Sequence, residues 1–294
     1  KGVVNYVKTY QGIIRIQRPD LGRGGKYRFR YRRVNPAGEI AYDTTAVREN
    51  GDINATRLEA GLYGTIERGT WNAKVYNYNS ERGIPGAIVN NVWRRGERVW
   101  GTNSFFQGSF VKEVNDQFKT QVNAKYAFYR THYVNNDDKL IEVDNLYKQR
   151  EVYVSTANMY TIFPFWDVSM SYDFQWNEMK ADMYGFVFPT RFTNLLSIAT
   201  ALRLGKVKLQ GSGLATFVND RVKEGPAPKA RQILTPAVFL SYKPFDKHDF
   251  SLRAFYKKTF RMPTFNDLYY ADMGNSKLDP EYVTQYNLGT VYQK

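Results

Sequence analysis

Hydrophobic and polar side chains alternate along most of this chain. Between Phe118 and Phe128 the sequence reads FKTQVNAKYAF. Successive side chains of a β-strand point to opposite faces. One face of this segment therefore carries Phe118, Val122, Ala124, Tyr126 and Phe128, and the other carries Lys119, Gln121, Asn123 and Lys125. Both a membrane β-barrel wall and a soluble β-sandwich show such alternation, so the strand lengths, the aromatic placement and the connections must distinguish them.

The same period of two predicts about thirteen strands, or about fourteen if residues 1–8 form another. The most regular segments are residues 167–177 and 249–258, where apolar and polar side chains alternate almost without interruption. The expected strands lie near residues 10–18, 26–33, 54–67, 71–79, 102–114, 118–131, 150–163, 167–177, 190–204, 207–218, 232–243, 249–258 and 283–293.

The connections between these strands alternate between long and short. The short ones have tight-turn chemistry, as at residues 67–70, 115–116, 164–166 and 205–206. The long ones span residues 34–53, 80–101, 132–149, 178–189, 219–231 and 259–282. Outer-membrane barrels have short turns at one end and long loops at the other. The pattern predicts an all-β fold, an antiparallel up-and-down transmembrane β-barrel segment that belongs to a larger barrel.

The composition agrees with a membrane wall. Aromatic residues make up 16% of the chain although its mean hydropathy is -0.55, and membrane barrels place such rings in girdles at the two water interfaces. The sequence has no run of about 18 apolar residues, as a transmembrane helix would need. Polar faces such as the one that carries Lys119 and Lys125 need water or a polar filling, because unpaired buried charge is expensive.

The net charge of +14 and the lack of cysteine narrow the chemistry. A basic chain suggests nucleic acid, an anionic membrane surface or an acidic substrate as partner. Many of the cations alternate with apolar residues inside expected strands, as lumen-facing groups would: Arg15, Lys119, Lys125, Arg253 and Lys257. The absence of cysteine excludes disulfides and thiol catalysis.

Two stretches near the end of the chain carry a family resemblance. Residues 260–270 read FRMPTFNDLYY, and residues 274–289 read GNSKLDPEYVTQYNLG. Together they resemble the C-terminal half of TonB-dependent outer-membrane receptors. The segments SERGIPG at 80–86 and RENGDIN at 48–54 look like those of the cobalamin and siderophore receptors within that family.

The resemblance implies a barrel of about 22 strands with a preceding plug domain. It also implies the outer membrane of a Gram-negative bacterium, uptake of a scarce metal chelate, and energy coupling to the TonB protein through the plug. No plug-like region or coupling peptide is visible in the sequence, so we expect residues 1–294 to form a single partial barrel domain. Lipopolysaccharide is a further expected partner, and nucleic acid is not.

The long loops contain the candidate ligand-binding residues. A basic and aromatic cluster suited to an anionic or planar chelate comprises Arg82, Trp93, Arg94, Arg95, Arg98 and Trp100. Tyr269 and Tyr270 could stack on a ligand, although interface anchoring is the alternative. The family motif adds Arg261, Pro263, Thr264, Phe265, Asn266, Asp267, Leu268, Pro280 and Glu281. The alternative for this motif is a stiff loop, and for the basic cluster it is lipopolysaccharide contact or a solvated face.

The sequence gives little support for an enzyme, a metal site or a cofactor. His132 and His248 are far apart in the sequence, and Asp137 and Asp138 lack the spacing of a calcium loop. Residues 22–25 read GRGG with nothing helical after them, and a turn is the simpler interpretation. Two rival functions stay open at this point: a passive outer-membrane pore and a soluble basic module that binds polyanions.

Overall fold

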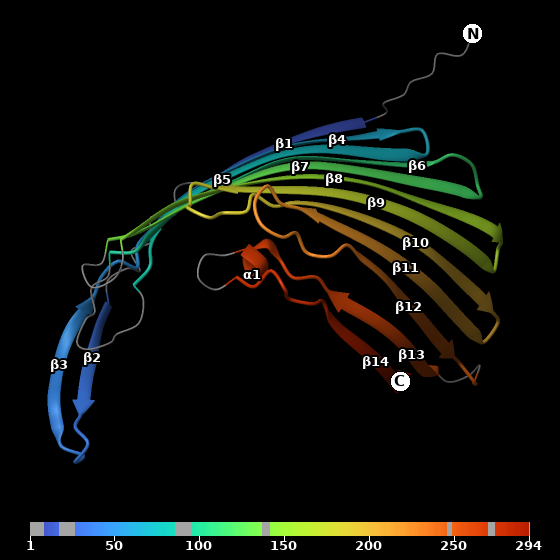
Figure 1. The fold of residues 1–294 in the computed structure, drawn as a ribbon. Helices are drawn as coiled ribbons and strands as arrows, with labels where there is room; N and C mark the ends of the chain where they lie inside the picture. The colour runs from blue at the N-terminus through green and yellow to red at the C-terminus, as the bar shows by residue number, and fades with distance from the viewer. Residues whose placement is uncertain are drawn as a thin grey trace, which may run out of the picture.

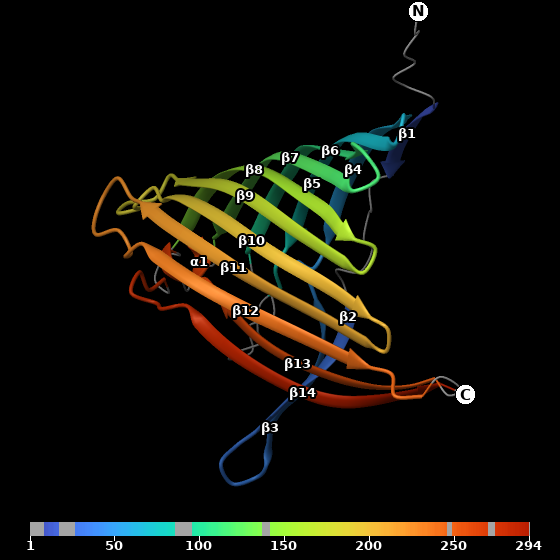
Figure 2. The ribbon, with the colours of Figure 1, turned by 90° about the vertical axis from the view of Figure 1, so that its right-hand side faces the viewer.

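A single curved antiparallel sheet dominates the structure. The computed structural model describes residues 9–17, 27–85, 96–136, 142–245, 249–269 and 274–293. Twelve strands follow one another across the sheet in chain order, except that β1 pairs directly with β4. The sheet forms a trough whose concave side carries the short helix α1, Phe265–Tyr269 (Figures 1 and 2).

The strands of this sheet alternate in direction, as an up-and-down barrel wall requires. From β4 onward they run from 12 to 21 residues, longer than the usual 5 or 6 in soluble sheets. Their bounds are β1 Thr9–Gln17, β4 Ile53–Ile66, β5 Gly69–Gly83, β6 Arg98–Glu113, β7 Phe118–Asn135, β8 Val143–Phe163, β9 Trp166–Ala181, β10 Thr190–Leu204, β11 Val207–Arg221, β12 Arg231–Tyr242, β13 Asp249–Arg261 and β14 Glu281–Gln293. The predicted fold class is thus confirmed.

Short turns lie at one end of the sheet and long connections at the other (Figure 1). At the short-turn end, Arg68 and Gly205 take positive φ angles of 55° and 56° to reverse the chain within two residues. At the long-loop end, several strands continue further than the sequence predicted. β7 and β8 pair up to Asn135 opposite Val143, so most of the expected loop 132–149 is hydrogen-bonded ladder.

One expected wall strand lies outside the wall. The prediction placed a wall strand at 26–33 and a loop at 34–53, but β2 (Tyr27–Val34) and β3 (Ile40–Arg48) form a separate two-stranded sheet. The prediction was wrong because β1 bonds directly to β4, which leaves the hairpin within the long connection between them. Asn35 Oδ1 closes its turn by accepting the N–H groups of Ala37 and Glu39 at 3.0 and 2.9 Å.

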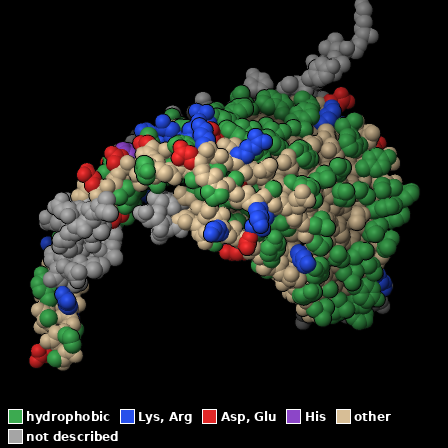
Figure 3. Space-filling model, in the orientation of Figure 1, with side chains coloured by type: hydrophobic (Ala, Val, Ile, Leu, Met, Phe, Trp, Pro, Cys, Tyr) green, Lys and Arg blue, Asp and Glu red, His purple; other side chains and the backbone are tan. Residues whose placement is uncertain are grey.

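The two faces of the wall differ in character. Large apolar side chains stand exposed on the convex face, including Phe106 at 52%, Met170 at 51%, Ile198 at 56% and Leu234 at 68% exposure. Figure 3 shows hydrophobic atoms over much of the outside of the sheet. Such a continuous apolar surface indicates contact with lipid. The alternate residues, among them Ser169, Ser171 and Asp173 of β9, lie on the concave face.

No helix within the described ranges is long and apolar enough to span a bilayer. Several residues of interest lie outside those ranges: the expected strand 1–8, the GRGG segment 22–25, Trp93, Arg94, Arg95, Asp137, Asp138, His248 and Tyr270.

Candidate ligand-facing site

The connection between β13 and β14 folds inward over the concave face at the long-loop end (Figure 2). Its helix α1 begins with a reciprocal capping arrangement. The Thr264 N–H donates to Asp267 Oδ2 at 2.8 Å, and the Asp267 N–H donates to Thr264 Oγ1 at 3.2 Å. The bond from the Thr264 backbone, followed by the interaction with the Thr264 hydroxyl, lowers the pKa of Asp267.

A buried ion pair on the wall holds this connection in place. Arg191 of β10 donates to both oxygens of Asp220 of β11, each at 2.7 Å. The Arg191 guanidinium also donates to the Pro263 carbonyl at 2.7 Å and lies 5.2 Å from the centre of the Phe265 ring. Arg191 and Asp220 are only 9% and 7% exposed. The planar guanidinium therefore joins two wall strands to the inward loop with paired hydrogen bonds.

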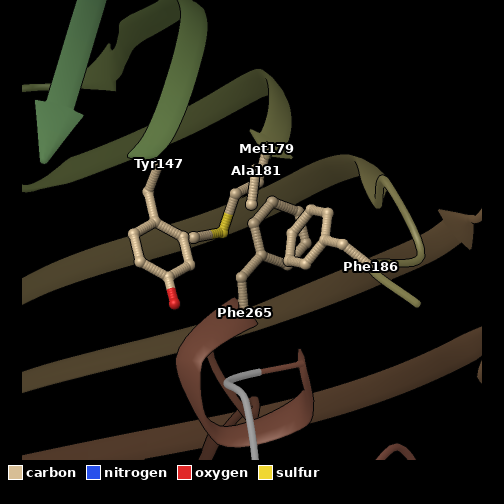
Figure 4. Close-up of a cluster of buried hydrophobic side chains, with 5 residues drawn as sticks. All are labelled: Tyr147, Met179, Ala181, Phe186 and Phe265. Atoms are coloured by element: carbon tan, nitrogen blue, oxygen red, sulfur yellow. The ribbon is translucent and has the colours of Figure 1, made fainter. Parts of the chain in front are cut away.

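An aromatic cluster forms a second attachment. Phe265 of α1 packs with Tyr147 of β8, Met179 and Ala181 of β9 and Phe186 of the next loop (Figure 4). Leu268 on the same helix is 4% exposed. Burial of a side chain such as Phe or Leu contributes about 1.5–3 kcal/mol. The apolar residues of the family motif therefore pack the loop against the wall, and its exposed residues Asn266 and Arg261 remain accessible.

Tyr269 lies at the edge of this cluster, where its hydroxyl is buried without a hydrogen-bond partner among the described residues. Burial, followed by the nearby Asp220 carboxylate, raises the pKa of Tyr269 to about 12. The phenol is therefore neutral at physiological pH. An unpaired buried hydroxyl is unfavourable.

A polar cavity of about 410 Å³ lies between α1 and the wall. Gln149, Glu151, Gln175 and Asn177 line it from β8 and β9. Thr264, Phe265 and Asn266 of the inward loop line the opposite side. Its walls offer hydrogen-bond donors and acceptors and one carboxylate.

The expected basic and aromatic cluster is divided between the two faces of the sheet. Arg82 is exposed and stands on the concave side, since it pairs with Val99 on the face opposite to Arg98. Arg98 and Trp100 stand on the convex side, where Trp100 stacks on His132 at 5.2 Å between ring centres. Strand parity therefore separates residues that the sequence grouped together.

The Arg98 guanidinium is already engaged by the protein. It donates to Asp52 at 2.9 Å, to Glu81 at 2.7 Å and to Asn50 at 3.2 Å. These bonds join the segment before β4 to β5 and β6. Arg98 accordingly stabilises the loop base, whereas Arg82 has no ion-pair partner among the described residues.

Several inward cations are also paired. Lys74 contacts Glu59 at 2.8 Å, and Lys125 contacts Glu151 at 3.0 Å. Lys74 and Lys125 both stand opposite Gln107 of β6 and so share a face of the sheet, and their ion pairs reduce the positive field of the concave face. The sequence reasoning missed Arg191 and Asp220. The sequence does contain a hint of this ion pair. Arg191 lies at the start of β10 and Asp220 near the end of β11, and a hairpin of these two strands places the two residues opposite each other.

Family membership follows from comparison with known proteins. The family model for the TonB dependent receptor-like β-barrel matches residues 5–294. The chain belongs to this family. Receptors with this barrel reside in the Gram-negative outer membrane, and the exposed apolar band places this TonB-dependent receptor wall there. A search of curated protein sequences finds no match.

Solved structures share the fold of this receptor wall at low sequence identity. The unliganded ferric citrate transporter FecA matches with a TM-score of 0.63 and 14% identity over 99% of this chain and 50% of FecA. The copper transporter OprC gives 0.69 and 12% over 98% and 52%. The FrpB iron transporter of Neisseria meningitidis gives 0.67 and 13% over 97% and 48%. The chain thus spans about half the length of each.

Proposed function

We propose that this chain forms the wall and part of the external surface of a TonB-dependent transporter for a scarce metal chelate of the siderophore or cobalamin type. The long loops capture the chelate, and the concave face receives it. Transporters of ferric citrate, copper and iron share its fold. Arg82 and Tyr269 are the described residues proposed to contact it. Trp93, Arg94, Arg95 and Tyr270 are proposed as further contacts.

The observation that carries this proposal is the inward loop fastened by Arg191 and Asp220. Removing two charges from water costs several kcal/mol per ion, so a buried ion pair is an expensive way to hold a loop across the concave face. A loop held there narrows the passage, which favours a ligand-binding surface over an open pore. Residues 262–269 then form the floor that a chelate meets when it passes the loop tips. Arg82 is exposed and supplies a positive charge near this floor.

The partners of the whole receptor are part of the same proposal. Energy coupling requires the TonB protein and a plug domain, and the external surface contacts lipopolysaccharide. Chelate binding by the loops would precede plug rearrangement, after which the chelate passes along the hydrated wall. No enzymatic step is proposed.

Binding to the complete receptor in detergent tests the proposal. Ferric citrate, a ferric hydroxamate siderophore and cyanocobalamin are suitable probes, measured by quenching of intrinsic fluorescence. We expect one class to bind, and Arg82→Ala to weaken binding of an anionic chelate about tenfold or more, as loss of a charged hydrogen bond does. Arg28→Ala on the β2–β3 hairpin removes an exposed cation elsewhere and is the matched control.

The same preparation discriminates between the rival functions. Ion conduction in planar bilayers with no binding of any chelate would favour the passive pore. Purification without detergent and steeply salt-dependent binding to polyanions would favour the soluble module. Either result would contradict the proposed function.

A further inference from the structure

The β2–β3 hairpin projects from the long-loop end of the wall (Figure 1). Hydrogen bonds fix the chain between this hairpin and β4 to the neighbouring strands. Asn50 Nδ2 donates to the Glu97 carbonyl at 2.7 Å, and the Arg98 guanidinium donates to Asp52 at 2.9 Å. The Asp52 carbonyl accepts the Gly83 N–H at 3.0 Å. The hairpin therefore extends from a base that is bonded to β5 and β6.

One face of the hairpin carries a row of arginines. Arg28, Arg30 and Arg32 alternate along β2 and so share a face, with about 6.6 Å between one position and the next. Arg30 pairs with Asp43 of β3 through both carboxylate oxygens, and its side chain is still 70% exposed. Arg28 and Arg32 are exposed and have no carboxylate within ion-pair distance in the part of the chain that the structure describes. We name Arg28, Arg30 and Arg32 the hairpin arginine row.

The strand that carries this row has a free edge. Among the described strands, β2 pairs with β3 alone. The backbone N–H and C=O groups on the other side of β2 therefore have no strand partner within the described ranges, as at any sheet edge. A two-stranded ribbon is marginally stable by itself, so a third strand would stabilise the hairpin. Exposed sheet edges bind extended segments in this way: main-chain hydrogen bonds give affinity, and alternate side chains give specificity.

The hairpin arginine row determines which strand can be added. Side chains directly opposite each other on one face of a sheet attract when their charges differ and repel when their charges are alike. A second copy of β2 would place this row beside itself, so the row disfavours pairing between two receptors. A strand with a carboxylate at every second position would instead place its negative charges beside the arginines.

We propose that the free edge of β2 binds an extended acidic segment of a partner protein at the cell surface. The segment adds to the hairpin as a third strand and sets its carboxylates against the hairpin arginine row. The long connections of an outer-membrane barrel face the exterior, so the partner approaches from outside the cell. A polyphosphate or a lipid headgroup cannot supply the main-chain hydrogen bonds of an added strand. The inference rests on the membrane placement of the wall and not on the identity of the transported chelate.

The test measures binding of short fluorescent peptides to the complete receptor in detergent, by fluorescence anisotropy. The alternating probe has Glu at every second position and Thr or Val between. The block probe has the same composition with its Glu residues adjacent, and a third probe is the alternating peptide with methylated backbone nitrogens. Arg28→Gln with Arg32→Gln removes the two unpaired charges of the row. Lys229→Gln with Lys277→Gln removes two exposed cations from other long connections and is the matched control.

The arginine variant should bind the alternating probe about tenfold more weakly than the wild type, at about threefold for each exposed ion pair. The lysine variant should bind as the wild type does, and the block and methylated probes should bind weakly to every form. Arg28→Glu with Arg32→Glu should prefer an alternating Lys probe to the Glu probe, which a merely unfolded hairpin would not do. Equal binding of the alternating and block probes, tight binding of the methylated probe, or unchanged affinity in the arginine variant would overturn the proposal.

Hydrogen exchange gives a second test, which distinguishes strand addition from contact through side chains alone. With the alternating probe bound, peptides covering residues 27–34 should gain protection, because the free N–H groups of β2 become hydrogen-bonded. Peptides from β8 to β10 should not change. Bound probe without added protection in residues 27–34 would refute an added strand. None of these measurements involves a chelate, so their failure leaves the proposed transport function untouched.

Discussion

Replacing Arg191 by Met should release the inward loop from the wall. Arg191 makes three hydrogen bonds of 2.7 Å, two to Asp220 and one to the Pro263 carbonyl. Met preserves much of the side-chain volume but leaves the Asp220 carboxylate, whose side chain is 3% exposed, without its partner. Loss of one member of a buried ion pair costs about 3–5 kcal/mol.

The free energy lost on breaking the ion pair cannot exceed the free energy that holds the loop against the wall, because the loop would then open and let water reach Asp220. The loop is held against the wall by burial of Phe265 and Leu268, which together contribute about 3–6 kcal/mol. The two free energies are comparable, so the loop should open locally and hydrate Asp220 while the barrel wall stays intact. We expect the free energy of loop opening to fall by about 3 kcal/mol, roughly a hundredfold in the opening equilibrium.

Hydrogen exchange followed by mass spectrometry measures this opening directly. Peptides covering residues 262–269 should lose protection in Arg191→Met, while peptides from β5 to β7 should not change. Arg203→Met removes a half-exposed partner of Asp167 and should have little effect, because exposed pairs contribute about 0–1 kcal/mol. Adding Asp220→Leu to Arg191→Met should restore protection. Full protection in the single variant would refute the role assigned to this pair.

Two further predictions concern the same end of the wall. Because the pKa of Asp267 is lowered in the folded protein, its capping contribution to stability is present above about pH 4 and is lost as the pH falls through the folded pKa. A spin label attached at Asn266→Cys should therefore become more mobile on acidification. In the Asp267→Asn background the mobility of the label should not depend on pH. Arg98→Ala should expose the segment around Asp52 to protease without changing chelate affinity, because the Arg98 guanidinium is engaged within the protein. A loss of chelate affinity without increased proteolysis would show instead that Arg98 contacts the ligand.

The alternation of side chains was sufficient to predict the wall and its two faces. In β9 the outward Met170 and the inward Ser171 lie where period two places them. The β2–β3 hairpin shows why this signal is ambiguous. Its alternating RFRYR segment has the same local pattern as a wall strand, and only the pairing of β1 with β4 excludes it from the wall.

The candidate site was less predictable because it depends on register and on long-range contacts. Arg191 and Pro263 are 72 residues apart in the chain, and nothing local to either residue indicates their hydrogen bond. Arg82 and Trp100 belong to neighbouring strands and were grouped by proximity in sequence. The strand register places them on opposite faces, which no residue count across a loop could establish.

The central claim is that lipid contacts the convex face of the wall and does not reach the concave face. The accessibility of spin labels along β9 to collision reagents tests this claim most directly. Single cysteines can replace Met170, Tyr172 and Phe174 on one face and Ser171 and Asp173 on the other, because the chain has no cysteine of its own. Spin labels at these sites in the complete receptor, reconstituted in bilayers, report collisions with lipid-soluble oxygen and with a water-soluble nickel chelate. We expect high oxygen and low nickel accessibility at Met170, Tyr172 and Phe174, and low oxygen accessibility at Ser171 and Asp173. Accessibility that does not alternate along the strand, or that alternates in the opposite sense, would contradict a membrane-spanning wall.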